Sequence, residues 1–549
     1  ATPMAPTHVF SDVGSYVAHW ASILYDISRS ESKENSSRTK DDLTISWVEG
    51  LQGPVAITSF NEGDKEDLRL GAAVYLERDA VVTVEAIDGG NTAADNKWVA
   101  TGVVCSIQDS VVSIALHECT DGLRAVDFSV KKGYSVSPRE LSLNVDRMQT
   151  GLTNFAVDEA SGCNFRVIQA ILGQLSVPLG ARHIRSISRA SAGLPMLSQA
   201  QEAACDMILT QAVSLVCGPP GTGKTTTVAQ IVRLLVHQKE GQVLVTAPSN
   251  TAVDNLTRTL CKLGFSVLRY TPSSRIAELS ESLPKGVSME SYTEDKSLLQ
   301  LYSTLQAEVG QLTDVDRREY SSLRRESSRA ALRSAAIVVC TCSACGDSFM
   351  SVLRFNNVVI DEAGQAIEPE CLLPIRLGAS RVVLVGDSKQ LGPVISAQRA
   401  LARGAGLSMF SRLEAVGIPS VLLDIQHRMH PSISAFMSQE FYGGNVADGP
   451  KVRVEREDVT FPWPDRAHPF FFRHVRDASR PEQHGGRRGT STYNQLEADA
   501  VVECVVALLE GGVLAREVGV IAMYDAQKTL LRTQLLDRGV QVDNVDAFQ

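Results

Sequence analysis

Long apolar runs are missing from this sequence. No stretch approaches the ~20 consecutive apolar residues that a membrane-spanning helix needs, so we expect no membrane among its partners. The first residues, Ala1-Thr2-Pro3-Met4, lack the basic and apolar regions of a secretory signal. They also lack an initiator methionine, and we therefore expect the chain to be a fragment of a longer protein.

An excess of positive charge is also missing. The formal net charge is −10, which argues against a protein that binds polyanions over its whole surface. Any nucleic-acid site must therefore be a local groove. Paired cysteine ligands are missing too, because Cys342-Ser343-Ala344-Cys345 is a lone C-x-x-C among scattered cysteines. This cysteine usage suits a reducing compartment, and we expect a cytoplasmic protein, with nuclear shuttling left open.

What is present is a glycine-rich loop between an apolar run and a helical pattern. Residues 218–225 read Gly-Pro-Pro-Gly-Thr-Gly-Lys-Thr and follow the apolar run 213–217. Such a loop wraps backbone N–H groups around phosphates, and the helix N-terminus adds its positive dipole end. Lys224 can reach the β- and γ-phosphates, and the hydroxyl of Thr225 suits Mg²⁺. The predicted nucleoside triphosphate site comprises Gly218, Pro219, Pro220, Gly221, Thr222, Gly223, Lys224, Thr225 and Thr226.

Two adjacent acids follow another apolar run. Asp361 ends this run and can hold Mg²⁺, while Glu362 can orient or deprotonate the attacking water. A third apolar run leads to Gln390, whose side chain can sense the γ-phosphate. A fourth leads to Arg428, which can stabilise charge on the transferring phosphoryl group as arginine fingers do. We predict catalytic roles for Lys224, Glu362, Gln390 and Arg428.

Two classes of NTPase are disfavoured by specific segments. A GTPase usually carries an Asn-Lys-x-Asp guanine reader, but the one Asn-Lys pair, Asn96-Lys97, is followed by Trp98-Val99. The phosphate loop alone leaves a ring-forming AAA-type ATPase open. The segment Gln-His-Arg-Met-His-Pro at 426–431 argues against it, because that segment belongs to superfamily-1 helicases.

At this point the chain resembles the superfamily-1 helicases of the up-frameshift type, which act in nonsense-mediated mRNA decay. Further matching segments are Leu197–Gln201, Ala247–Asp254, Cys340–Cys342, Gly386–Val394 and Val545–Gln549. The resemblance implies an α/β fold with two RecA-like parallel-sheet P-loop domains, an inserted β-barrel on a helical stalk and a helical insertion. It also implies ATP and Mg²⁺ as cofactors and 5′→3′ movement on single-stranded RNA. Other mRNA-decay factors are the implied partners of a monomer.

The same resemblance assigns further residues. Gln201 would read adenine. The side chain of His427 would stack on the adenine ring, and Arg428 would contact ATP. Ser249, Asn250 and Thr341 would contact the nucleic-acid backbone. The family usually has Tyr where this chain has His427, and a His titrates near neutrality. We therefore expect ATP affinity to vary more between about pH 6 and 7.5 than in a His427→Tyr variant; identical profiles would refute this.

The pattern along the chain predicts an order of domains. The strands predicted at 243–246 and 337–339 are much farther apart than the ~30 residues of a βαβ unit, which predicts an insertion. Its basic helix is either a salt-bridged surface or a phosphate-tracking one. The predicted parts are an N-terminal stalk helix (1–43), a β-barrel (44–143), stalk helices and a linker (144–195), a first RecA-like domain (196–400, with a helical insertion at about 272–333) and a second RecA-like domain (401–549).

Alternatives remain open at this stage. The same fold can serve as an ATP-switched RNA clamp that does not unwind, or as a DNA/RNA helicase of the immunoglobulin-mu-binding or senataxin type. The family continues beyond the motif at Gln549 with Gly-x-Glu and a second arginine motif. We therefore expect this fragment alone to bind ATP poorly or to turn it over slowly.

Overall fold

The computed structural model divides the chain into two compact units. Unit 1 comprises Ala1–Cys217 and Lys224–Leu422, and unit 2 comprises Gly218–Gly223 and Leu423–Gln549. The residues described are 9–35, 40–43, 45–50, 53–59, 73–79, 97–108, 111–119, 134–138, 142–157, 163–174, 197–238, 241–272, 283–284, 286–288, 326–453, 461–465, 468, 470–476, 483–485 and 491–545.

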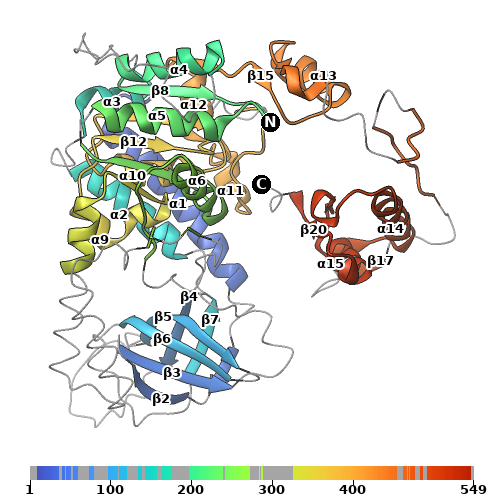
Figure 1. The fold of residues 1–549 in the computed structure, drawn as a ribbon. Helices are drawn as coiled ribbons and strands as arrows, with labels where there is room; N and C mark the ends of the chain where they lie inside the picture. Colours follow the sequence, from blue (N-terminus) through green and yellow to red (C-terminus); the bar gives the residue numbers. More distant parts are fainter. Residues whose placement is uncertain are drawn as a thin grey trace, which may run out of the picture. The chain divides into compact units, whose positions relative to one another are not determined.

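A seven-stranded parallel sheet forms the centre of unit 1 (Figure 1). Its strands are runs of β-branched and other apolar residues, and most are buried along their whole length, as expected for a parallel sheet covered on both faces. The order across the sheet is β10 (Val267–Arg269), β11 (Ile337–Thr341), β9 (Val243–Ala247), β12 (Asn357–Ile360), β13 (Arg381–Gly386), β8 (Val213–Cys217) and β14 (Ser420–Leu422).

Helices connect these strands and cover the sheet. They are α4 (Gln199–Thr210), α5 (Lys224–Gln238), α6 (Asn250–Lys262), η5 (Ser343–Gly346), α9 (Ser348–Ser351), α10 (Glu368–Ile375), α11 (Gln398–Ala402) and α12 (Met409–Ala415). This arrangement confirms the predicted α/β class with a parallel-sheet P-loop domain.

Strand order brings the predicted site segments to one edge of the sheet. Strand β13 pairs with both β8 and β12, so the three carboxyl ends are neighbours. The phosphate loop follows β8, Asp361 follows β12, and the turn that leads to Gln390 follows β13. Ligands bind at this end of an open parallel sheet.

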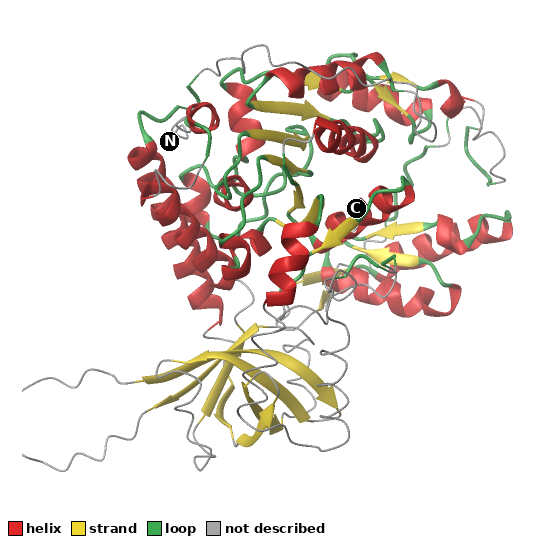
Figure 2. Cartoon of the chain, turned by 60° about the vertical axis from the view of Figure 1, so that its left-hand side comes forward, coloured by secondary structure: helices red, strands yellow, loops and turns green. Residues whose placement is uncertain are grey.

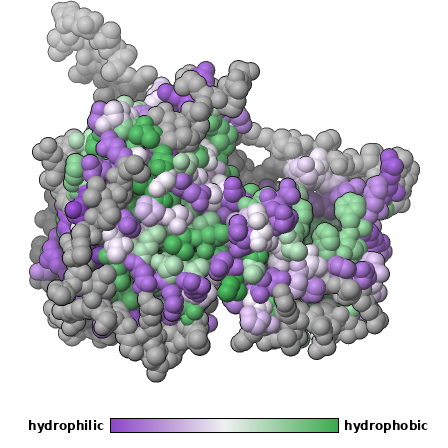
Figure 3. All heavy atoms as spheres, turned by 90° about the horizontal axis from the view of Figure 1, so that it is seen from above, coloured by the Kyte–Doolittle hydropathy of each residue, from purple (hydrophilic) through white to green (hydrophobic). Residues whose placement is uncertain are grey.

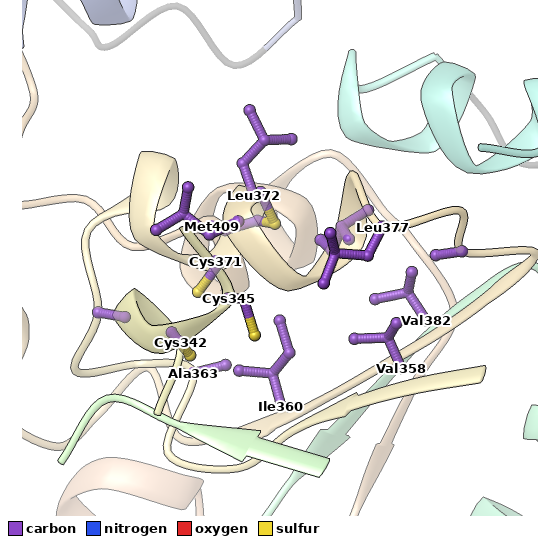
Figure 4. Close-up of a cluster of buried hydrophobic side chains, with 14 of the residues drawn as sticks. Cys342, Cys345, Val358, Ile360, Ala363, Cys371, Leu372, Leu377, Val382 and Met409 are labelled. Atoms are coloured by element: carbon purple, nitrogen blue, oxygen red, sulfur yellow. The ribbon is translucent and has the colours of Figure 1, made fainter. Parts of the chain in front are cut away.

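The main core lies between the sheet and helix α10. Figure 4 shows Val358 and Ile360 of β12, Val382 of β13, and Cys371 of α10 in this cluster, and all four are buried by more than nine-tenths. Cys342 and Cys345, in the segment after β11, extend the same cluster. Buried thiols of this kind act as small hydrophobic side chains.

Before the parallel sheet, two long helices bracket an antiparallel sheet. The helices are α1 (Val13–Asn35) and α2 (Ser142–Val157), and the short α3 (Phe165–Ile171) follows. The antiparallel strands, yellow in Figure 2, run in the order β1 (Lys40–Leu43), β7 (Tyr134–Pro138), β4 (Ala73–Asp79), β5 (Lys97–Gln108), β6 (Val111–Cys119), β3 (Gly53–Ser59) and β2 (Ile45–Gly50). The predicted strand at 81–87 lies outside the described residues.

A buried ion pair ties the N-terminal segment to the parallel-sheet core. Arg412 of α12 donates to both carboxylate oxygens of Glu368, at 2.8 and 2.5 Å, and to the carbonyl oxygen of Ile171 at 2.5 Å. Its guanidinium also lies 5.3 Å from the ring centroid of Phe10. One arginine thus joins α12, α10, α3 and the segment that precedes α1.

Unit 2 has a smaller core. It contains β15 (Ile425–Gln426), α13 (Pro431–Tyr442), β16 (Ala447–Asp448), η6 (Pro450–Arg453), β17 (Gln483–Gly485), β18 (Ser491–Tyr493), α14 (Gln495–Glu510), η7 (Ala515–Glu517), β19 (Gly519–Ile521), α15 (Asp525–Leu535), η8 (Leu536–Arg538) and β20 (Gln541–Asp543). Strands β19 and β20 pair in parallel, and α14 and α15 pack over them.

The division between the units falls later than the predicted domain start at 401. Residues 401–422 supply α12 and β14, and β14 pairs with β8 in the first sheet. Most of the predicted insertion at 272–333, including Arg325 of its basic face, lies outside the described residues. Residues 326–334 are helical, and Arg329 stacks its guanidinium 5.5 Å from the centroid of Phe349.

None of the helices in the described parts is both long and apolar enough to cross a bilayer. On the face shown in Figure 3, hydrophobic side chains reach the surface in patches between hydrophilic ones. Such a mixed surface is ordinary for a folded protein, whose accessible area is largely apolar atoms.

Candidate functional site

The phosphate loop has the backbone conformation that its glycines permit. Gly221 and Gly223 have φ angles of 78° and 83°, which L-residues rarely adopt. Between them, the Thr222 hydroxyl donates to the carbonyl oxygen of Pro219 at 2.8 Å and closes the turn. Helix α5 then begins at Lys224, so the loop ends at a helix N-terminus suited to an anion.

Lys224 and Glu362 form an ion pair in unit 1. Their Nζ and Oε1 atoms are 3.4 Å apart, and both side chains are largely shielded from solvent. Gln365 donates its side-chain amide to the other carboxylate oxygen of Glu362 at 3.3 Å. Among the described non-glycine residues, Glu362 alone has a positive φ, of 50°. A strained backbone of this kind costs about 1–3 kcal/mol and persists only where the surrounding structure holds it, which is more common at functional sites than elsewhere.

Asp361 is a buried carboxyl group at the end of β12. Burial and, to a smaller extent, the charge of Glu362 raise its pKa to about 7, although Lys224 opposes the shift. The backbone N–H of Glu362 donates to Asp361 Oδ1 at 3.0 Å and favours the ionised form. A divalent cation would favour that form much more strongly, because a bound cation is the largest local charge in such a site.

The residues present fit Mg²⁺. Asp361 and Thr225 offer a carboxylate and a hydroxyl, the oxygen ligands that a hard cation prefers. In the described parts of the chain, no three His, Cys, Asp or Glu side chains gather as a metal cage. Mg²⁺ usually keeps several waters and binds through one or two carboxylates plus substrate phosphates, which is the kind of site these residues can form.

Gln390 is held by an acid that the sequence analysis did not single out. Its side-chain amide donates to Asp387 Oδ2 at 2.6 Å, and Asp387 Oδ1 accepts the backbone N–H of Lys389 at 3.0 Å. The turns after β12 and β13 also approach closely. A Cβ on Gly386 would lie 2.9 Å from the backbone nitrogen of Gly364, so glycine is required there.

Arg428 belongs to unit 2, as does the segment Gly218–Gly223 of the phosphate loop. The backbone N–H of His427 donates to the carbonyl oxygen of Gly221 at 2.8 Å. A Cβ on Gly221 would lie 2.6 Å from Cβ of Arg428, so the two backbones are in contact. Both His427 and Arg428 are exposed. The structure therefore brings the predicted arginine to the phosphate loop, more than two hundred residues away in sequence.

Gln201 occupies the start of α4. Its side-chain oxygen accepts the backbone N–H of Ser198 at 3.0 Å, and Ser198 Oγ accepts the N–H of Gln201 at 3.2 Å. This reciprocal pair is a capping box. The assignment of Gln201 to adenine stays a prediction.

The three predicted nucleic-acid contacts lie at the ends of paired strands. Strand β9 ends at Ala247, which pairs with Thr341 at the end of β11, and Ser249 and Asn250 follow β9 directly. Ser249 caps α6, and Thr341 Oγ1 accepts the N–H of Ala344 at 3.2 Å. The side-chain oxygen of Asn250 accepts from Arg269 at 3.0 Å. Their contacts with nucleic acid stay predictions.

Comparison with known proteins identifies the family. Two AAA-domain families match, one over residues 196–315 and 273–398 and the other over residues 405–549. The Arabidopsis thaliana protein "Regulator of nonsense transcripts 1 homolog" is 35% identical over 530 residues, which cover 93% of this chain and 41% of that protein. The Schizosaccharomyces pombe protein "ATP-dependent helicase upf1" is 33% identical over 567 residues, covering 98% and 59%. The chain belongs to the regulator of nonsense transcripts 1 family.

This membership confirms the resemblance to the up-frameshift type. The chain spans about two fifths to three fifths of the length of these two members of the regulator of nonsense transcripts 1 family. A solved structure titled "Crystal structure of Arterivirus nonstructural protein 10 (helicase)" is 14% identical, covers 70% of this chain and 60% of that one, and has a TM-score of 0.29. A likeness that weak informs neither fold nor function.

Two residues with structural roles in the site were missed by the sequence analysis. Asp387 stands three residues before Gln390, so the turn after β13 was a usable signal for their hydrogen bond. Gln426, whose side-chain oxygen accepts the backbone N–H of Arg428 at 2.8 Å, offered no local signal beyond its place in the motif.

Proposed function

We propose that this chain is the motor core of an ATP-dependent RNA helicase that acts in nonsense-mediated mRNA decay. The observation that carries the proposal is the pairing around the phosphate loop. Lys224 pairs with Glu362, and the carbonyl of Gly221 accepts the N–H of His427 beside Arg428. The names of the relatives support ATP hydrolysis and the decay pathway. The 5′→3′ direction is proposed from the family resemblance.

The residues have distinct tasks in hydrolysis. The triphosphate would lie on the backbone N–H groups of the loop, where Lys224 would exchange Glu362 for phosphate oxygens. Glu362, released from the Lys224 ammonium, would then accept a proton from the attacking water. Gln390 would sense the γ-phosphate, and Arg428 would stabilise charge on the phosphoryl group as it transfers. Mg²⁺ held by Thr225 and Asp361 would neutralise charge on the phosphates.

Nucleic-acid binding would use the ends of β9 and β11. We propose that Ser249, Asn250 and Thr341 contact phosphate and sugar of single-stranded RNA. Such contacts carry little sequence information, so binding should tolerate any sequence. Loss of the γ-phosphate would release the protein segments that contact it. Their movement would advance the protein along the RNA strand. We further propose a cytoplasmic monomer with other decay factors as partners.

The test measures ATP hydrolysis and strand separation together, using the full-length protein (the full chain). Single-stranded RNA should stimulate ATP hydrolysis, and an RNA duplex with a 5′ single-stranded tail should be displaced in an ATP-dependent way. A duplex with a 3′ tail shows the direction of movement along the strand. A matched DNA duplex shows whether the protein prefers RNA or DNA. Binding of RNA controlled by ATP, without displacement, would instead identify a clamp. Absence of RNA-dependent ATP hydrolysis would contradict the motor.

A further inference from the structure

The loop that carries Arg428 is closed by one buried side chain. The side-chain oxygen of Gln426 accepts the backbone N–H groups of Arg428 at 2.8 Å and of Met429 at 2.7 Å. Its amide nitrogen donates to the carbonyl oxygen of Met429 at 2.8 Å. Gln426 is fully buried. Three of its four hydrogen-bonding positions are therefore used to fold the loop back on itself.

The fourth position is used by Asp448, which lies outside the motif. Gln426 donates its remaining amide hydrogen to Asp448 Oδ1 at 2.6 Å. The two residues lie directly opposite each other in the parallel pair of β15 and β16, and the backbone N–H of Gly449 donates to the carbonyl oxygen of Gln426 at 2.8 Å. Ser434 of α13 donates its hydroxyl to the same Asp448 oxygen at 2.5 Å.

The carboxylate fixes which way round the Gln426 amide lies. An ionised Asp only accepts hydrogen bonds, so the group that faces it must be the NH₂ and not the oxygen. The oxygen then faces the N–H groups of Arg428 and Met429, which need an acceptor. A reversed amide would place its oxygen against the carboxylate and its NH₂ against two backbone donors. A hydrogen bond to a charged group is stronger than one between neutral groups, so the carboxylate keeps the amide in one orientation.

We propose that Asp448 is a positioning residue for Arg428, acting through Gln426. This inference rests on the proposed function, in which Arg428 stabilises the transferring phosphoryl group. Asp448 touches neither Arg428 nor the phosphate loop in the contacts described above. It sets the orientation of the amide that holds the backbone N–H of Arg428, and that backbone abuts Gly221 of the phosphate loop.

Loss of Asp448 should weaken catalysis more than nucleotide binding. Arginine fingers act in the transition state, where a displacement of about 1 Å can cost roughly 100-fold in rate. We expect Asp448→Ala to lower kcat for RNA-stimulated ATP hydrolysis by about 10- to 100-fold, with KM for ATP changed less than about threefold. Asp448→Asn keeps one acceptor but loses the charge, so its kcat should fall between Asp448→Ala and the unchanged protein.

The decisive test is a double-mutant cycle in the full chain. Arg428→Ala, Asp448→Ala and the double variant are compared in single-turnover ATP hydrolysis, with Asp537→Ala as a control at an exposed acid of the same unit. If Asp448 acts through Arg428, its removal should change nothing further once Arg428 is gone. Thermal unfolding of each variant shows whether the loss follows from unfolding, and circular dichroism checks that every variant is folded.

The outcomes separate this inference from the proposed function. If Arg428→Ala leaves the rate unchanged, the role assigned to Arg428 fails and this inference fails with it. If Arg428→Ala slows hydrolysis but Asp448→Ala does not, only the inference is overturned. Equal fractional losses from Asp448→Ala with and without Arg428 would also overturn it, since they indicate a general structural effect.

Discussion

The backbone N–H of His427 donates a 2.8 Å hydrogen bond to the carbonyl oxygen of Gly221. This bond joins the glycine-rich loop to a segment more than two hundred residues later in the chain. It places the backbone of Arg428 against the loop that is expected to hold a triphosphate.

Glu362→Gln should separate nucleotide binding from turnover. The amide keeps the size and the strained backbone position of Glu362 but cannot accept a proton. We expect kcat to fall by about 10²–10⁴-fold, while the dissociation constant for ATP stays similar or decreases because Lys224 loses its competing partner. Equilibrium titration with a fluorescent ATP analogue and a phosphate-release assay measure the two quantities. Hydrolysis at the normal rate would refute the assigned role.

Lys224→Ala should weaken ATP binding and spare RNA binding. Its ammonium group supplies charged hydrogen bonds to phosphate, so we expect a loss of about 10- to 100-fold in ATP affinity. Lys262→Ala, at an exposed lysine of α6, is the matched control. Calorimetric titration gives the ATP affinity, and fluorescence anisotropy of labelled single-stranded RNA gives the RNA affinity. A parallel loss of RNA affinity would mean that Lys224 serves the fold more than the nucleotide.

Arg412 and Glu368 should behave as a buried pair. Arg412→Ala would leave the carboxylate of Glu368 without its guanidinium, at a cost of about 3–5 kcal/mol in the free energy of unfolding. The double variant Arg412→Met with Glu368→Leu should recover most of this loss, because it removes both charges and keeps the volume. Urea denaturation measures both. A double variant no more stable than Arg412→Ala would show that packing against Phe10 matters more than charge.

Glu370 should make stability fall as pH rises. Burial raises its pKa to about 7 in the folded protein, above the 4.5 of an ordinary Glu. Between these values the unfolded chain binds fewer protons than the folded one, so the free energy of unfolding decreases with rising pH. Glu370→Gln removes this term and should gain up to about 3 kcal/mol relative to the native chain above pH 7, and nothing near pH 4. Denaturation curves across this range test it, with Glu510→Gln as the exposed control. A gain of equal size at every pH would contradict the assignment.

Local patterns in the sequence were enough to place the candidate site segments at the ends of strands. The phosphate loop, Asp361 and Glu362 each follow an apolar strand, and parallel pairing of those strands brings their ends together without further information. Local patterns do not predict contacts between residues that lie far apart in the sequence. Asp448 meets Gln426 through two strands of two residues each, which are too short to show a period. Arg412 and Glu368 lie 44 residues apart on separate helices.

The boundary between the two sheet domains depends on strand pairing that the sequence does not show. The predicted second sheet domain, 401–549, includes the apolar run at 421–425. In the structure its first part pairs with β8, and the chain turns at Leu423 into unit 2. An apolar run of this length fits the edge of either sheet equally well, so pairing partners alone decide it.

The central claim is that Lys224 and Arg428 act on a single triphosphate. The most direct measurement compares the affinity of the full chain for ADP and for ADP with aluminium fluoride, which imitates the transferring phosphoryl group. Arg428→Ala should bind ADP normally but lose about 10²-fold or more in affinity for the fluoride complex, because an arginine finger contributes in the transition state. An unchanged affinity for the fluoride complex in Arg428→Ala would contradict the claim.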